Sequence, residues 1–388
     1  MTRLALTIQP GGPGTPASKV LAQLFSRSET GTTRSHSVVL DIGHTTTLEL
    51  DPGHVFVQLR LPSGELLTDE RVLETGGDTE ITFGLAGSRH EWLGWDKLVS
   101  RGAAARSPGD GPAELAAGEP LVAQARLHRA GLPVLELGFD QPTLDGAARF
   151  VIHGDANATS LTIEGYSGQT AMVELVLADG RREMVAAPLP WLGEASSPVP
   201  IQLVLERCTA GTRACVIIQD PTFSSMLAYY ASGDRSAARD FAPMLEARAR
   251  QAVMAKLHNP CACVAGVLVL RRMPCAPLPS AWLDSLADIS AISDAAILYA
   301  THLMETRERR NDRARMRHWL LEARRRGVPV FAECGRMLYA GLRRLAAADP
   351  DDAEVAAAAG WARALVDASR SDTIFSWLTA ELPQGGTP

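Results

Sequence analysis

The stretch Val55-Phe56-Val57-Gln58-Leu59-Arg60-Leu61 determines the predicted fold of the amino-terminal part, because aliphatic residues occupy every second position. This alternation is typical of a β-strand with one buried face. Pro62-Ser63-Gly64 follows as a tight-turn sequence, and residues 65–67 then predict a partner strand. A second turn at Gly76-Gly77-Asp78 precedes another alternating stretch. We therefore predict that residues 1–100 form an antiparallel β-sandwich.

A second strand-rich region follows a spacer of different composition. Residues 101–118 are rich in Ala, Gly, Pro and Ser, which indicates an exposed linker. Beyond them, short apolar runs alternate with turn sequences such as Asp179-Gly180 and Thr209-Ala210-Gly211-Thr212. These patterns predict a second β-sandwich-like domain over residues 119–221.

The period of the apolar residues changes from that of strands to that of helices after Pro221. Met316, Trp319, Leu320 and Ala323 form a stripe along one predicted helix. Asp349-Pro350-Asp351-Asp352 supplies capping side chains for the start of another. We expect about six to eight helices in an irregular bundle over residues 222–388. The predicted fold class is a multidomain α+β protein.

The composition is that of a folded chain. Of its 388 residues 46% are hydrophobic and 21% are charged, which excludes a disordered chain, a fibrous repeat and a highly charged nucleic-acid carrier. The amino terminus does not resemble a secretory signal, and no apolar stretch reaches the length of a bilayer span. Six cysteines do not make a dense disulfide framework. We expect a cytoplasmic protein with reduced thiols and no membrane contact.

Charge is distributed unevenly within a net charge of −6. Acidic residues dominate before Pro221, whereas the basic excess lies in one arginine-rich stretch at residues 307–326. From this stretch we select as binding residues Arg307, Arg309, Arg310, Arg313, Arg317, Arg324 and Arg325. A solvated helix face is the simplest interpretation, and a docking surface for an acidic protein comes next. Nucleic acid comes third as a partner, because acidic residues dilute the charge and no aromatic platform accompanies it.

Two tryptophans, Trp92 and Trp95, stand close together in His90-Glu91-Trp92-Leu93-Gly94-Trp95. Paired aromatic residues commonly fill an interface, so we add both to the predicted binding residues. The same stretch lacks the second histidine of a His-Glu-x-x-His zinc motif.

One pair of residues suggests nucleophilic catalysis. His153-Gly154 precedes Cys208, and each follows an apolar strand, the order in which caspase-like proteases carry their catalytic residues. The caspase-like fold, however, needs parallel strands with helical crossovers, whereas hairpin turns separate His153 from Cys208. We predict no catalytic residue and keep a divergent cysteine peptidase using these two residues as an alternative.

Three other cysteines indicate packing rather than metal binding. Cys261 and Cys263 are separated by one residue, so on a helix their side chains diverge and do not fit a zinc pair. Cys334 has no recognisable base partner. We therefore predict three buried small residues, no metal site and no cofactor.

Three stretches carry a family resemblance: residues 90–95, Tyr229-Tyr230-Ala231-Ser232-Gly233-Asp234 and Arg326-Gly327-Val328-Pro329-Val330-Phe331. They resemble a group of bacterial proteins with a β-rich front half and a helical rear half. That group is similar to proteins encoded beside caspase-like proteases in conflict or defence systems. The resemblance implies a partner, regulator or substrate of such a protease and carries no catalytic residues.

Together these observations favour a non-enzymatic interaction protein. We expect a regulator, adaptor or proteolytic target in a bacterial defence pathway linked to a caspase-like protease. The partner would be that protease or a factor that it regulates. The alternatives are the cysteine peptidase and a nucleic-acid-binding regulator that uses the helix at Arg307–Arg326.

Overall fold

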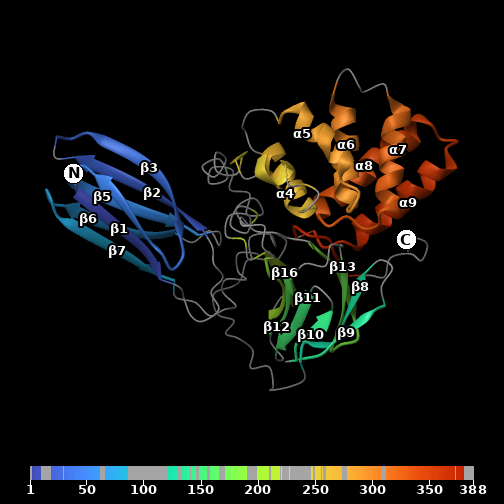
Figure 1. Cartoon of the computed structure of the whole chain (residues 1–388), viewed down its shortest axis with the longest axis horizontal. Coiled ribbons are helices and arrows are strands. Elements are labelled where there is room, and N and C mark those ends of the chain that lie inside the picture. Colours follow the sequence, from blue (N-terminus) through green and yellow to red (C-terminus); the bar gives the residue numbers. More distant parts are fainter. Residues whose placement is uncertain are drawn as a thin grey trace. The chain divides into compact units, whose positions relative to one another are not determined.

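Two compact units make up the chain (Figure 1). The first consists of Met1–Ala103 with Ile218–Pro243, and the second of Ala104–Ile217 with Met244–Pro388. The structure is a computed structural model. It describes residues 2–9, 19–28, 30–61, 66–85, 120–129, 133–139, 141–145, 148–154, 158–165, 171–189, 199–208, 211–218, 220, 227, 246–247, 250–254, 256, 259–272, 278–306, 312–371 and 373–379.

The first unit contains two packed sheets. The order β4-β1-β7 is that of a three-stranded sheet formed by β1 (Thr2–Gln9), β4 (Thr45–Leu50) and β7 (Asp78–Gly84). The order β3-β2-β5-β6 is that of a four-stranded sheet formed by β2 (Lys19–Ser28), β3 (Thr33–Asp41), β5 (Gly53–Arg60) and β6 (Leu66–Leu73). The described pairs are antiparallel except β1 with β7, which are parallel. A parallel pair needs a long connection, and the strands that lie between β1 and β7 in the sequence provide it.

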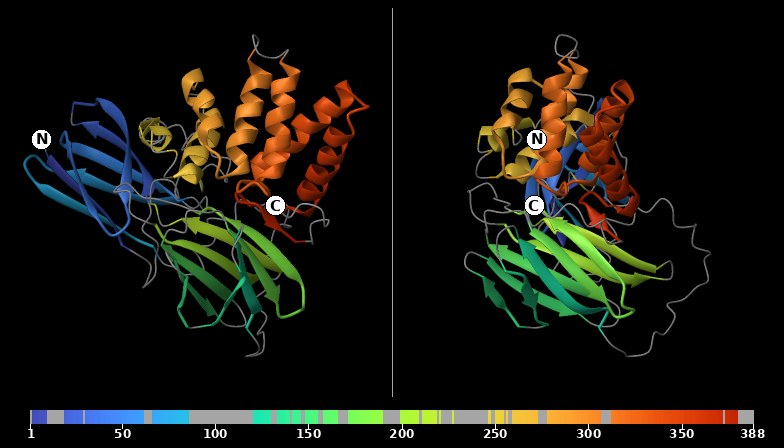
Figure 2. Two further views of the ribbon diagram at one scale, coloured as in Figure 1. Left: turned by 45° about the vertical axis from the view of Figure 1, so that its right-hand side comes forward. Right: turned by 90° about the vertical axis from the view of Figure 1, so that its right-hand side faces the viewer.

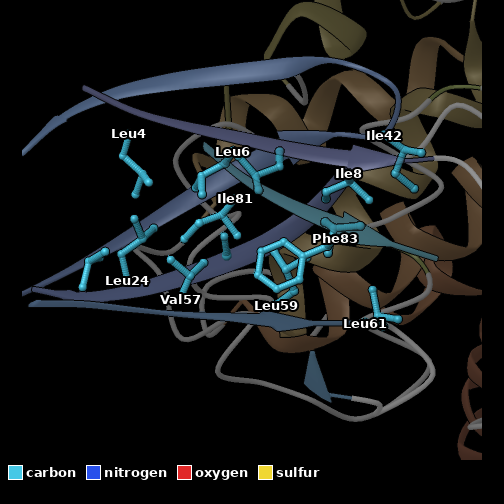
Figure 3. Close-up of a cluster of buried hydrophobic side chains, with 14 of the residues drawn as sticks. Leu4, Leu6, Ile8, Leu24, Ile42, Val57, Leu59, Leu61, Ile81 and Phe83 are labelled. Atoms are coloured by element: carbon cyan, nitrogen blue, oxygen red, sulfur yellow. The ribbon is translucent and has the colours of Figure 1, made fainter. Parts of the chain in front are cut away.

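Strand alternation builds the core of this unit, as the sequence predicts. Figure 3 shows side chains from both sheets pointing towards one another, and those labelled there are Leu4, Leu6, Ile8, Leu24, Ile42, Val57, Leu59, Leu61, Ile81 and Phe83. Burying each such side chain contributes about 1.5–3 kcal/mol. The β2–β5 pairing also requires a glycine, since Gly53 has φ 139° and a Cβ there would overlap the carbonyl oxygen of Arg27.

The second unit begins with a further pair of five-stranded sheets. One has the order β10-β11-β12-β15-β16, from β10 (Thr143–Asp145), β11 (Ala148–Gly154), β12 (Ala158–Gly165), β15 (Ile201–Cys208) and β16 (Gly211–Ile218). The other has the order β17-β14-β13-β8-β9, from β8 (Val122–Arg129), β9 (Leu135–Leu137), β13 (Ala171–Leu177), β14 (Arg182–Ala187) and β17 (Trp377–Leu378). The strand pairs with a described register are antiparallel.

The second unit also contains helices. They are α4 (Pro260–Arg272), α5 (Ser280–Asp284), the 3₁₀ helix η2 (Ser285–Asp288), α6 (Ser293–Glu305), α7 (Arg313–Arg325), α8 (Ala332–Ala348) and α9 (Ala353–Ala368). Figure 2 shows α6 to α9 running alongside one another. The Asp352 carboxylate accepts a hydrogen bond from the backbone N–H of Val355, which confirms the capping role predicted for this aspartate.

The last strand joins the helical part to the second pair of sheets. β17 follows α9 and pairs with β14 at the sheet edge, where Val185 faces Trp377. The backbone N–H of Ser376 donates to the carbonyl oxygen of Val330, just before α8, at 2.8 Å. This segment is therefore hydrogen bonded to the sheet on one side and to the helical part on the other.

A buried ion and an indole reinforce this junction. Glu183 on β14 is 2% exposed, and its Oε2 accepts a hydrogen bond of 2.5 Å from Nε1 of the fully buried Trp377. The guanidinium of Arg370 lies 3.8 Å from the same oxygen. Buried carboxylates need such partners, so the contact ties the two parts together energetically as well as topologically.

The structure confirms the predicted fold class, with β-sheets ahead of a helical part in a mixed α+β chain. Within the described ranges, no helix combines the length and the apolar character that crossing a membrane requires. The predicted linker at residues 101–118 lies outside the described residues.

Candidate interaction surfaces

The structure does not bring the backbones of His153 and Cys208 together. His153 lies on β11 and Cys208 on β15, and β12 runs between these strands. His153 is paired with Ser160, and Ser160 is paired with Val204, four residues before the cysteine. With neighbouring strands about 4.8 Å apart and a rise of about 3.3 Å per residue, the two Cα atoms are separated by roughly 16 Å. The antiparallel sheet also differs from the parallel sheet of a caspase-like fold.

Five of the predicted binding residues fall outside the described residues. They are Trp92, Trp95, Arg307, Arg309 and Arg310. The other four, Arg313, Arg317, Arg324 and Arg325, lie on α7.

Several arginines of α7 are used within the protein. Arg325 pairs with Glu322 at 2.6 Å, and Arg326 pairs with the other oxygen of Glu322 at 3.0 Å. Hydrogen bonding by Arg326 lowers the pKa of Glu322. Arg315 donates to the hydroxyl of Tyr299 on α6, and its guanidinium lies 5.4 Å from the centre of that ring. These three arginines therefore stabilise α7 and its contact with α6.

Arg317 joins α7 to the start of α9. Its guanidinium donates to the two carboxylate oxygens of Asp352 at 2.5 and 3.1 Å and to Glu354 at 2.7 Å. These hydrogen bonds raise the pKa of Arg317 above its ordinary value. The pKa of Asp352 is lowered to about 2. The hydrogen bond from Arg317 has the largest effect, and the one from the Val355 N–H has the next largest. These contacts give Arg317 a structural role in the bundle, and the binding role that the sequence suggests for it stays a prediction.

Four other arginines of α7 and α8 are different. We use the name free arginine set for Arg313, Arg324, Arg343 and Arg344. Their side chains make no ion pair or hydrogen bond in the part of the chain that the structure describes. Arg313, Arg343 and Arg344 are exposed and Arg324 is half-buried. The guanidinium of Arg343 lies 5.7 Å from the ring centre of Tyr339. These cations can pair with acidic groups without breaking an ion pair or hydrogen bond of the described chain.

The sequence reasoning missed Arg343 and Arg344, because it concentrated on the longest basic run. A helical stripe was the available signal. Arg336, Ala340, Arg343, Arg344 and Ala347 all occupy the exposed side of α8, whereas Leu338 and Leu342 are buried.

Three buried thiols and one buried carboxylate lie inside the helical part. Cys261, Cys263 and Cys334 are free and buried, which confirms the packing role predicted for them. Burial raises the pKa of each thiol, to about 12 for Cys263, so these groups stay protonated and unreactive. No group of metal-ligating side chains occurs among the described residues.

Asp294 is the buried carboxylate. It is fully buried on α6, and its two oxygens accept the backbone N–H groups of Val330 at 2.8 Å and Phe331 at 2.9 Å. Burial raises its pKa to about 6, while these two hydrogen bonds and one with Cys334 act in the opposite direction. Asp294 satisfies amide groups next to the first turn of α8, so its role is structural.

A second charged surface lies on the sheet that contains β8, β13 and β14. Glu174 is nearly buried, and its carboxylate lies 2.9 Å from His128 Nε2. The guanidinium of Arg182 is 3.6 Å away, and that of Arg126 is 3.9 Å away. Each cation comes from a strand next to that of Glu174. The alternation Gln124, Arg126, His128 along β8 was the available signal for this polar face.

Comparison with known families places the helical part alone. Residues 225–387 match the family model of the Y4kD C-terminal domain. The matched range covers less than half of the chain and includes the described helices α4 to α9 and the strand β17. No curated protein matches the chain, and no solved structure does. The match supports a family relationship for this part and does not bear on caspase-like proteases.

Proposed function

We propose that this protein is a non-enzymatic interaction protein that binds an acidic segment of a partner protein through the free arginine set of α7 and α8. One observation supports this function. Other arginines of the same region are held by internal carboxylates, as Arg317 is by Asp352, whereas the free arginine set has no such partner in the described chain. A guanidinium group recognises carboxylates through paired hydrogen bonds, which suits an acidic peptide or protein surface.

The resemblance of three sequence stretches supports a more specific form of this proposal. The partner is then a caspase-like protease, or a factor that it regulates, in a bacterial defence pathway. The chain acts there as regulator, adaptor or cleavage target, in the cytoplasm. This part of the proposal rests on the quoted residues 90–95, 229–234 and 326–331 and on nothing in the geometry.

The test is affinity capture of the full chain co-expressed with the proteins of its genomic neighbours. The variant Arg313→Glu/Arg344→Glu reverses two free cations. The matched control Arg336→Glu/Arg363→Glu makes the same change of charge at two exposed arginines that pair with Glu333 and Asp367. We expect the first variant to reduce capture at least tenfold and the control to retain it. Equal capture by both variants contradicts the proposal.

Two other outcomes overturn it. If the purified protein cleaves peptides and Cys208→Ala abolishes this activity, the protein is an enzyme. Salt-sensitive binding to single-stranded RNA that is lost in Arg313→Glu/Arg344→Glu, without capture of a protein, identifies a nucleic-acid-binding regulator.

A further inference from the structure

The outer face of the four-stranded sheet in the first unit carries an exposed aromatic pair. Phe25 on β2 and Phe56 on β5 are partners in the sheet register and are 41% and 37% exposed. Their ring centres lie 6.2 Å apart with an angle of 39° between the planes. β2 and β5 are the two central strands of this sheet, so the rings lie at the middle of its face rather than at an edge.

An amide pair lies directly beside the rings. Gln23 and Gln58 are partners in the same register, two residues along each strand from the phenylalanines, so strand alternation puts them on the same face. Both are half-buried, and neither side chain makes a hydrogen bond in the described chain. Each amide therefore offers an unused oxygen acceptor and an unused N–H donor beside an aromatic surface.

Hydroxyl groups continue this row on the outer strands. Ser37 is the partner of Gln23 on β3, and Thr68 is the partner of Gln58 on β6, and both residues are exposed. Ser37, Gln23, Gln58 and Thr68 thus form a row of neutral polar groups across all four strands. We call this row together with Phe25 and Phe56 the aromatic–amide platform.

The two rows that hold the platform contain one charged residue, Glu70, whose carboxylate lies 3.8 Å from His54 Nδ1. In the register, Arg27 occupies the row beyond the rings and Arg60 the row beyond the amides. Single-stranded nucleic acid needs a positively charged path along its backbone in addition to stacking aromatics. The two rows of the platform contain no lysine or arginine, so a neutral ligand fits them better.

We propose that the aromatic–amide platform binds a neutral oligosaccharide. A pyranose ring has an apolar C–H face, which stacks on an aromatic ring, and a rim of hydroxyl groups that both donate and accept hydrogen bonds. Phe25 and Phe56 provide two adjacent stacking surfaces, and the amides of Gln23 and Gln58 form hydrogen bonds with the hydroxyl groups of the rim. This site is on a different unit from the free arginine set and does not depend on the proposed function.

The rings and the amides contribute to binding in different ways, so removing one or the other has a different effect on binding. Stacking removes apolar area from water and supplies most of the affinity. The amides select ligands with hydroxyl groups in reach, because a ligand without them leaves the amides unpaired. Removing a ring therefore lowers the affinity for every sugar that binds, whereas removing an amide changes which sugar is preferred.

The experiment titrates the full chain with cellohexaose, maltohexaose and xylohexaose in an isothermal calorimeter. The variants are Phe25→Ala, Phe56→Ala and Gln58→Ala, and Val72→Ala is the matched control. Val72 is an apolar residue of edge strand β6 on the same sheet and is 59% exposed. We expect at least one hexaose to bind, each phenylalanine variant to bind it at least tenfold more weakly, and the control to bind it unchanged. Phe56→Tyr, which keeps the ring, retains binding.

Three outcomes overturn the proposal. In the first outcome, none of the three hexaoses binds. In the second, the phenylalanine variants bind a hexaose as tightly as the unmodified chain does. In the third, sedimentation shows a dimer that Phe25→Ala converts to a monomer, which makes the face a contact between two copies. Circular dichroism of each variant verifies that the sheet is intact, and a variant that unfolds is replaced by the corresponding Ser substitution.

Discussion

Replacing Asp294 with Asn changes how the stability of the second unit depends on pH. The Asp294 carboxyl is fully buried, and burial raises its pKa from the ordinary 3.8 to about 6. The folded protein therefore binds the proton of this group more tightly than the unfolded chain does. The stability that the protonated group contributes is fully present below about pH 3.8 and is lost as the pH rises through about 6.

The size of this loss follows from the pKa difference. One pKa unit corresponds to about 1.4 kcal/mol, so the full difference amounts to about 3 kcal/mol. Between about pH 4 and pH 7 we expect the free energy of unfolding of the unmodified protein to fall by about 2–3 kcal/mol relative to Asp294→Asn. Asparagine also leaves one of the two N–H groups of Val330 and Phe331 without an acceptor, a cost of about 1–3 kcal/mol that does not depend on pH.

Urea unfolding measures this effect when it is followed by the circular dichroism signal of α-helices. The helices α4 to α9 all lie in the second unit, so this signal reports on that unit. Both proteins are unfolded at several values of pH, and the difference between their free energies cancels the titration of all other groups. Asp294→Ala serves as a second variant and should give the same pH dependence with a larger constant offset. A difference that stays flat within about 0.5 kcal/mol from pH 4 to 7 refutes the reasoning.

Four further changes test the packing. Trp377→Phe removes the donor to buried Glu183 and should lower the free energy of unfolding of the second unit by about 1.5–3 kcal/mol in urea; an unchanged midpoint contradicts this hydrogen bond. Gly360→Ala, in open space on α9, should raise stability by about 0.5–1 kcal/mol. Gly341→Leu should lower it by about 1–3 kcal/mol, because even a Cβ there would meet packed side chains at 3.0 Å. Thermal unfolding should move in opposite directions for these two variants. Gly53→Ala should reduce hydrogen-exchange protection along β2 and β5, since its φ and the nearby backbone leave no room for a Cβ.

Local patterns predicted most individual elements because their causes are local. The alternation at residues 55–61 follows from one buried and one exposed face, and the cap at Asp352 needs only the next three residues. The parallel pairing of β1 with β7 depends on residues some 70 positions apart, so no window of sequence could show it. Long-range pairing is decided by which sheet edges remain open once the hairpins have formed.

The candidate surfaces were predicted less well for a related reason. The sequence shows that Arg317 and Arg324 are cationic, and only tertiary structure shows that Asp352 lies against the first and that the second has no partner in the described chain. The aromatic–amide platform was missed because Phe56 reads as one more apolar residue in an apolar strand. Its exposure becomes visible only when Phe25 and the sheet face are known.

The strand β17 shows how far such long-range effects reach. β17 consists of two residues that follow the last helix and have no strand signature of their own. Trp377 is nevertheless fully buried, and β17 forms one edge of the sheet β17-β14-β13-β8-β9. Since the edge of β14 would otherwise leave amide groups unpaired, the carboxy-terminal segment satisfies them and also covers Glu183. The second pair of sheets and the helical part consequently share hydrogen bonds, an ion pair and an edge strand. This shared structure explains physically why a division by sequence period alone separates residues that the folded chain places in one compact unit.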